Sequence, residues 1–108
     1  MQLESKLKKI CDEVDGSIGA FFCGLDGICI GLYRSRQSDT DMELLAANFA
    51  SVIRNIKEAS DIVVTFKSEV VAIKIVQEGF VGVVMPRDGN LGRLKLELNK
   101  VGGDFLNG

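Results

Sequence analysis

A chain of 108 residues is long enough for one domain with its own hydrophobic core and too short for two. Its net charge is only −2, and Lys and Arg are spread along the chain without interleaved aromatic residues, which argues against nucleic acid as the main partner. The N-terminal segment mixes charges with Leu and Ile, and no run approaches the ~18 apolar residues of a membrane span, so we expect no signal peptide, no membrane insertion and a cytoplasmic location.

The first predicted element is an amphipathic helix at about residues 2–14, in which apolar residues recur at helical spacing. Gly16 ends it, because glycine after a helix readily takes the left-handed backbone conformation. Two strands follow, at residues 17–23 and 28–33. Residues 24–27 join them and contain Asp-Gly between two apolar runs, which is a strong hairpin signal.

Glycines also lie in or beside these two strands, at positions 19, 24 and 31. A glycine inside a strand weakens it and usually marks a bulge or the close approach of another segment. The pattern therefore predicts a helix that crosses closely over the hairpin.

The longest helical pattern runs from Asp41 to Ala59 and contains neither glycine nor proline. Ser38, Asp39 or Thr40 is its expected N-cap, since short polar side chains favour that position. Its apolar residues fill an arc of about 180°, whereas a helix that contacts one sheet needs a stripe only a little over ~100° wide. The excess predicts that this helix covers a sheet and also meets a second body.

Three further strands are predicted at residues 62–66, 70–76 and 80–85, and the short turns between them indicate antiparallel pairing. Their apolar runs lack clean alternation with polar residues, which indicates that helices cover both faces of the sheet. Asn90 is expected to cap a last helix that ends at Gly102-Gly103, leaving residues 102–108 as a frayed tail. The order of elements is α-β-β-α-β-β-β-α.

The residue inventory argues against catalysis. Histidine is absent, which excludes a Ser/His/Asp triad, a Cys/His dyad and the commonest zinc sites, and we expect no enzyme activity, no metal and no cofactor. The three cysteines form no Cys-x-x-Cys motif and are most simply three small buried thiols in a reducing compartment. A Cys23–Cys29 pair on neighbouring strands, acting as a redox site, is the alternative.

Together, GSIGAFFCGLDGICIG, LLAANFASVIRNI and VGVVMPRDGNLGRLKLEL, in this order and spacing, resemble the Roadblock/dynein light-chain family from about residue 3 to 101. The resemblance implies a single domain over residues 1–108. It implies a profilin-like, longin-related α+β sandwich whose five-stranded antiparallel sheet has the order 2-1-5-4-3. Members of the family dimerise through the second helix and third strand, and regulate or scaffold small Ras-like GTPases; one bacterial member activates a polarity GTPase without donating a catalytic residue.

We therefore expect a homodimer, or a heterodimer with a related Roadblock chain, that binds a small Ras-like GTPase. The helix residues expected at the dimer interface, divided between the sheet core and a helix–helix seam, are Met42, Leu45, Phe49, Val52, Ile53 and Ile56. The strand residues expected to pair edge to edge in the dimer are Ile62, Val63, Val64, Thr65 and Phe66. Those expected to face the GTPase are Asn48, Arg54, Asn55 and Glu58. The alternative is a small-ligand sensor of the profilin or PAS-like type, which would need a cavity with convergent polar groups between sheet and helix.

Overall fold

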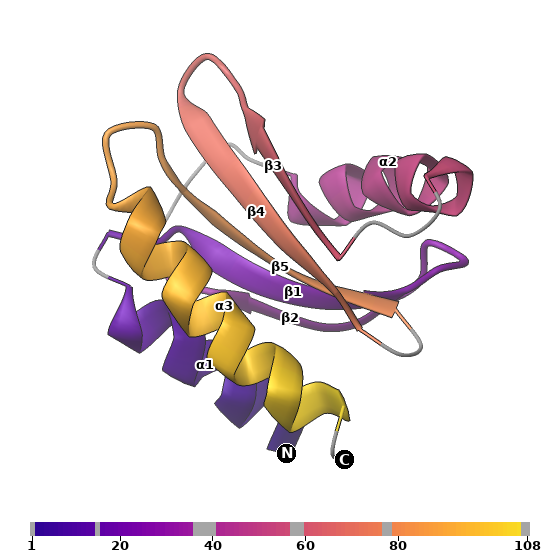
Figure 1. Cartoon of the computed structure of the whole chain (residues 1–108), viewed down its shortest axis with the longest axis horizontal. Coiled ribbons are helices and arrows are strands. Elements are labelled where there is room, and N and C mark those ends of the chain that lie inside the picture. Colours follow the sequence, from indigo (N-terminus) through magenta and orange to yellow (C-terminus); the bar gives the residue numbers. More distant parts are fainter. Residues whose placement is uncertain (1, 15, 36–40, 57–59, 77–78, 107–108) are drawn as a thin grey trace.

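The computed structural model describes residues 2–14, 16–35, 41–56, 60–76 and 79–106, and its elements follow the predicted order (Figure 1). The helices are α1 (Gln2–Glu13), α2 (Met42–Asn55) and α3 (Leu91–Leu106). The strands are β1 (Gly19–Gly24), β2 (Cys29–Arg34), β3 (Asp61–Thr65), β4 (Glu69–Val76) and β5 (Gly79–Pro86).

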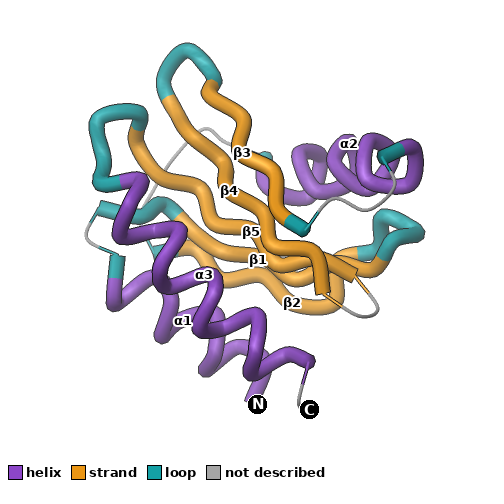
Figure 2. Tube along the Cα trace, in the orientation of Figure 1, coloured by secondary structure: helices purple, strands orange, loops and turns teal. Residues whose placement is uncertain are grey.

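The strands form one antiparallel sheet in the order β2-β1-β5-β4-β3, which confirms the predicted topology (Figure 2). Helices α1 and α3 lie side by side on one face, and α2 lies on the other (Figure 1). The central strands β5 and β4 are buried almost throughout, as their unbroken apolar runs predicted. Strands β2 and β3 form the two edges of the sheet.

Two hydrophobic cores result, one on each face of the sheet. The core on the α1–α3 side is built mainly from Leu7, Ile10, Val14, Ala20, Val81, Val83, Met85, Leu94 and Leu98. The core on the α2 side is built mainly from Phe21, Met42, Phe49, Ile53, Val71, Ile73, Phe80 and Val84. In the second core the rings of Phe21 and Phe80 meet edge to face, with centroids 6.1 Å apart, a favoured arrangement for aromatic pairs.

Close helix crossing over the hairpin is confirmed at two glycines. A Cβ atom at Gly31 would lie 2.7 Å from Leu3 Cδ2 of α1. A Cβ atom at Gly19 would lie 2.7 Å from Met42 Sδ of α2 and 2.6 Å from the Tyr33 carbonyl oxygen. The absence of a side chain at these positions lets α1 and α2 approach the hairpin from opposite faces.

Helix α2 begins and ends at positions that differ from the prediction. Its N-cap is Asp41, whose backbone is extended and whose carboxylate accepts a hydrogen bond from the Leu44 N–H at 3.1 Å, so the expectation of a cap at residues 38–40 was wrong. The helix ends at Asn55 because Ile56 takes an extended conformation as its C-cap. The last predicted residues, 57–59, lie outside the described part of the chain.

Helix α3 begins as expected, because the Asn90 side chain caps it by accepting a hydrogen bond from the Arg93 N–H at 3.0 Å. It does not stop at the two glycines, however, and continues to Leu106. Glycine lowers helix propensity by about 1 kcal/mol relative to alanine but keeps its N–H, so it disfavours a helix without blocking it. The expected stop at Gly102-Gly103 was therefore wrong.

The β1–β2 hairpin joins two of the cysteines. Its register places Cys23 opposite Cys29, with their Cα atoms 4.0 Å apart, and the two form a disulfide. The simpler expectation of three separate thiols is thus wrong for this pair. Only Cys11, buried on α1, is a free thiol among the described residues.

Candidate functional site

The outer edge of β3 carries backbone groups that face away from the sheet. The Phe66 N–H donates to the Glu69 carbonyl at 2.7 Å, and the Ile75 N–H donates to the Ser60 carbonyl at 2.9 Å. Since hydrogen-bonded pairs alternate in an antiparallel ladder, Ile62 and Val64 also direct their backbone groups toward β4. The N–H and C=O groups of Val63 therefore point outward, where another strand could pair with them.

The surface of α2 next to this edge is apolar. Successive helix residues are rotated by about 100°, so Leu45, Val52 and Ile56 fall within about 40° of one another on one side of the buried stripe. We call these three residues the apolar flank. Val52 is 43% exposed and Ile56 44% exposed, which is unusual for a patch of adjacent aliphatic side chains.

The other side of α2 identifies the direction in which the apolar flank faces. The Arg54 side chain donates a hydrogen bond to the Leu25 carbonyl oxygen in the β1–β2 turn. Glu43 and Ala47 lie within about 40° of Arg54 around the helix and line a groove beside β2. Because this side faces β2, the apolar flank faces the half of the sheet that ends in β3.

The structure divides the predicted dimer residues between core and surface. Met42, Phe49 and Ile53 are buried between α2 and the sheet, with exposed fractions of 1%, 6% and 6%. The residues that remain at least partly accessible are Leu45, Val52, Ile56, Ile62, Val63, Val64, Thr65 and Phe66. Phe66 lies just beyond β3, in the turn to β4.

The residues expected to face a GTPase do not form one surface. Asn48 and Asn55 are exposed and lie about 20° apart on the outer side of α2. Arg54 lies about 120° from Asn48 and is engaged at the Leu25 carbonyl. Glu58 is outside the described residues.

Sequence reasoning missed three strongly exposed aliphatic side chains. Leu44 on α2 is 59% exposed, Ile30 on β2 is 63% exposed, and Ile28, just before β2, is 66% exposed. Residues 28–33 were predicted only as the returning strand of a hairpin, and nothing in their pattern marked the two isoleucines as exposed. Their exposure follows from the position of β2 at the sheet edge.

The described residues offer little chemistry of their own. Their two buried polar side chains are Ser17, which donates to the Cys11 carbonyl oxygen at 3.0 Å, and Glu97, which pairs with Lys100 at 3.3 Å and Arg93 at 3.4 Å. Over the same ranges, no cluster of three or more His, Cys, Asp or Glu residues has the arrangement of a metal site. Among the described helices, none combines the length and apolar character that crossing a membrane requires.

The sensor alternative required polar groups that converge in a cavity between α2 and the sheet. That interface is instead filled by large apolar side chains, including the fully buried Phe21, Met42 and Phe80. Both of the buried polar side chains described above lie elsewhere. The packing between α2 and the sheet therefore gives the sensor alternative no support.

No protein-family model matches the sequence, and neither does any curated protein. Solved structures do match. MglB of Myxococcus xanthus superimposes with a TM-score of 0.82 at 14% identity, over 99% of this chain and 94% of that one. A Roadblock/LC7 domain from Streptomyces avermitilis superimposes with a TM-score of 0.79 at 13% identity, over 94% of this chain and 92% of that one. Profilin IA of Acanthamoeba castellanii gives 0.68 at 11% identity, over 96% of each chain.

These similarities establish the fold. The chain has the fold of Roadblock domains, with a profilin-like arrangement of its helices and sheet. The three structures are only 11–14% identical to this chain in sequence, so the similarity concerns the fold alone.

Proposed function

We propose that the chain is a non-enzymatic homodimeric scaffold that binds and regulates a small Ras-like GTPase. The observation that carries this proposal is the juxtaposition of an open strand edge, β3, and the apolar flank of α2 on one side of a Roadblock-like domain. In the dimer, Val63 would pair across the two β3 edges to continue the sheet, and the apolar flanks would bury each other.

Self-association has support from the fold relatives as well as from the surface. One structure of MglB is described with a tetrameric arrangement, so a domain of this fold can assemble. An edge strand without proline and with aliphatic residues along it favours pairing with another chain. Single exposed aliphatic residues are common, but Val52 and Ile56 stand one helical turn apart next to such an edge.

The GTPase partner is inferred from the family that the sequence resembles. Dimerisation through α2 would leave Asn48 and Asn55 on the outer surface of the helix, where they could contact a partner. The described surface of α2 offers no histidine and no free catalytic pair, since Arg54 is held at the Leu25 carbonyl. Any stimulation of GTP hydrolysis would therefore come from ordering the GTPase's own groups.

The test is binding of purified small Ras-like GTPases from the same genome, each loaded with GDP or a GTP analogue, to the immobilised chain. We expect one of them to bind, and Asn48→Arg to weaken that binding without changing the mass of the scaffold. Asn99→Arg, which places the same charge on an exposed position of α3, is the matched control and should have no effect. If no GTPase binds in either nucleotide state, the GTPase part of the proposal is wrong.

A further inference from the structure

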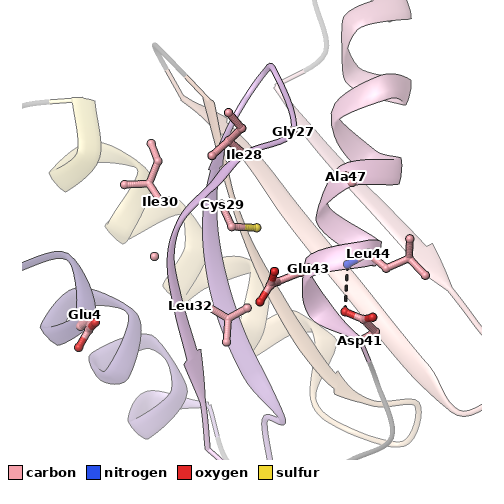
Figure 3. Close-up of a pocket in the computed structure, with 11 residues that line it drawn as sticks. Glu4, Gly27, Ile28, Cys29, Ile30, Leu32, Asp41, Glu43, Leu44 and Ala47 are labelled. Atoms are coloured by element: carbon pink, nitrogen blue, oxygen red, sulfur yellow. Dashed lines mark hydrogen bonds between the residues drawn. The ribbon is translucent and has the colours of Figure 1, made fainter.

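The opposite edge of the sheet, at β2, carries a groove that the proposed dimer does not use. It has a volume of about 840 Å³ and is bordered by the edge of β2, the N-terminal part of α2 and one residue of α1 (Figure 3). We call it the β2 groove. Its lining includes the aliphatic side chains of Ile28, Ile30, Leu32 and Leu44, and the first two are more than 60% exposed.

The backbone of β2 faces this groove. The Ser35 N–H donates to the Ile18 carbonyl oxygen at 2.8 Å, and the register then directs the backbone groups of Tyr33 and Gly31 toward β1. Leu32, between them, presents its N–H and C=O outward. In the described part of the chain, β2 has a strand partner on one side only, so the edge offers hydrogen-bonding groups to a further strand.

The rim of the groove is acidic on both faces of the sheet. Glu4 projects from α1 on one side of β2, and Asp41 and Glu43 stand at the start of α2 on the other (Figure 3). Among the described residues that line the groove there is no Lys or Arg. Successive side chains of an added strand would point alternately to these two faces, so basic residues at either set of positions would meet a carboxylate.

We propose that the β2 groove binds an extended, lysine- or arginine-rich segment of another protein, which adds a strand to the sheet at β2. Backbone pairing with Leu32 provides the register, contact with Ile28 and Ile30 buries apolar surface, and the carboxylates select a cationic partner. A second copy of this chain fits poorly, because pairing two β2 edges would bring the acidic rims of both copies together.

The disulfide supports this use of the strand. Cys29 lines the groove, and its bond to Cys23 ties β2 to β1 next to the irregularity that separates Phe22 from Cys23 in the register. The position of the edge is thereby fixed before any partner arrives. A preformed edge loses less conformational freedom on binding than a mobile one.

The experiment is a titration of the oxidised, isotope-labelled chain with a synthetic peptide of about six alternating valine and lysine residues, followed by amide NMR. The expected result is saturable binding with shifts concentrated at residues 28–32 and 41–43, which weakens as salt is raised. The matched peptide of valine and glutamate should not bind. Replacing one central valine by proline should weaken binding, because a strand N–H is lost.

Protein variants separate the groove from a general attraction of charges. Glu43→Gln and Glu4→Gln should each lower the affinity roughly two- to fivefold, the range for exposed ion pairs. Ile30→Lys should abolish binding, and Asp88→Asn, an exposed acidic residue in the β5–α3 loop, should leave it unchanged. The mass of the scaffold should stay the same in all of them.

Three outcomes would overturn the proposal. One is the absence of saturable binding, and another is equal binding of the glutamate peptide. The third is a change in the chain's own mass with Ile30→Lys, which would make the groove a contact between copies. The first two outcomes do not bear on the β3 edge, so they leave the proposed GTPase scaffold untouched. The third would also contradict β3 as the interface between copies, because β2 and β3 lie at opposite edges of the sheet.

Discussion

Substitution of Val52 by aspartate should dissociate the proposed dimer while leaving the fold intact. Fully burying a valine side chain stabilises by about 1.5–3 kcal/mol. Burying the 43% of Val52 that is still exposed would therefore contribute roughly 0.7–1.3 kcal/mol to dimerisation. A two-fold axis doubles this contribution, to roughly 1.3–2.6 kcal/mol per dimer. Losing it would raise the dissociation constant roughly 10- to 80-fold, and the desolvated carboxylate would add to that.

The assay is sedimentation equilibrium over a range of concentrations, with the melting temperature measured alongside. Val and Asp have similar helix propensities, and a change at an exposed position shifts stability by no more than about 0.5 kcal/mol. Leu96→Asp on α3, where the side chain is 50% exposed, is the control and should leave the dissociation constant unchanged. Phe49→Asp should instead prevent folding, because its ring lies under the sheet and losing it costs about 3–5 kcal/mol. An unchanged dissociation constant for Val52→Asp would refute the apolar flank as an interface.

Three further predictions concern the strand edge and the cysteines. Val63→Pro should weaken dimerisation in the same sedimentation assay with little effect on the melting temperature. Val64→Pro should instead lower the melting temperature, because it removes a hydrogen bond to β4 and leaves an acceptor unpaired, which costs roughly 1–3 kcal/mol. A larger loss of melting temperature for Val63→Pro than for Val64→Pro would contradict the register. The unfolded, unreduced chain should show one reactive thiol in a colorimetric thiol assay, and three after reduction, since Cys23 and Cys29 are bonded; three before reduction would contradict the disulfide. Burial raises the pKa of Cys11, so the unfolded chain loses its proton first and the free energy of unfolding should fall as pH rises above about 8.5. In urea titrations at several pH values, Cys11→Ala should reduce this fall in the free energy of unfolding. An identical pH dependence in both proteins would contradict the role given to Cys11.

The fold could be predicted because local patterns and global architecture agree. Apolar runs without alternation correctly placed helices on both faces, and Gly19 and Gly31 correctly marked where α1 and α2 cross the hairpin. The ends of helices were less predictable. After Asn55 the chain has no glycine or proline for several residues, yet α2 ends there because Ile56 takes an extended backbone conformation.

The candidate surfaces were only partly predictable, because they depend on which strands pair, in which register, and on which face of α2 packs against the sheet. The sequence marked the helix with excess apolar surface, but it could not show that Met42 and Phe49 take the buried stripe while Val52 and Ile56 stay exposed. The disulfide depends on the hairpin register, which sets Cys29 opposite Cys23. The β2 groove exists only because β2 is an edge strand, a property of the whole sheet order.

The most direct test of the central account is the molar mass of the purified chain, measured by light scattering at micromolar concentration. The account predicts a mass of twice the 11.7 kDa of one chain, and a shift toward 11.7 kDa for Val52→Asp. A wild-type chain that remains at 11.7 kDa over the whole concentration range would contradict the proposal that β3 and the apolar flank of α2 form an interface between two copies.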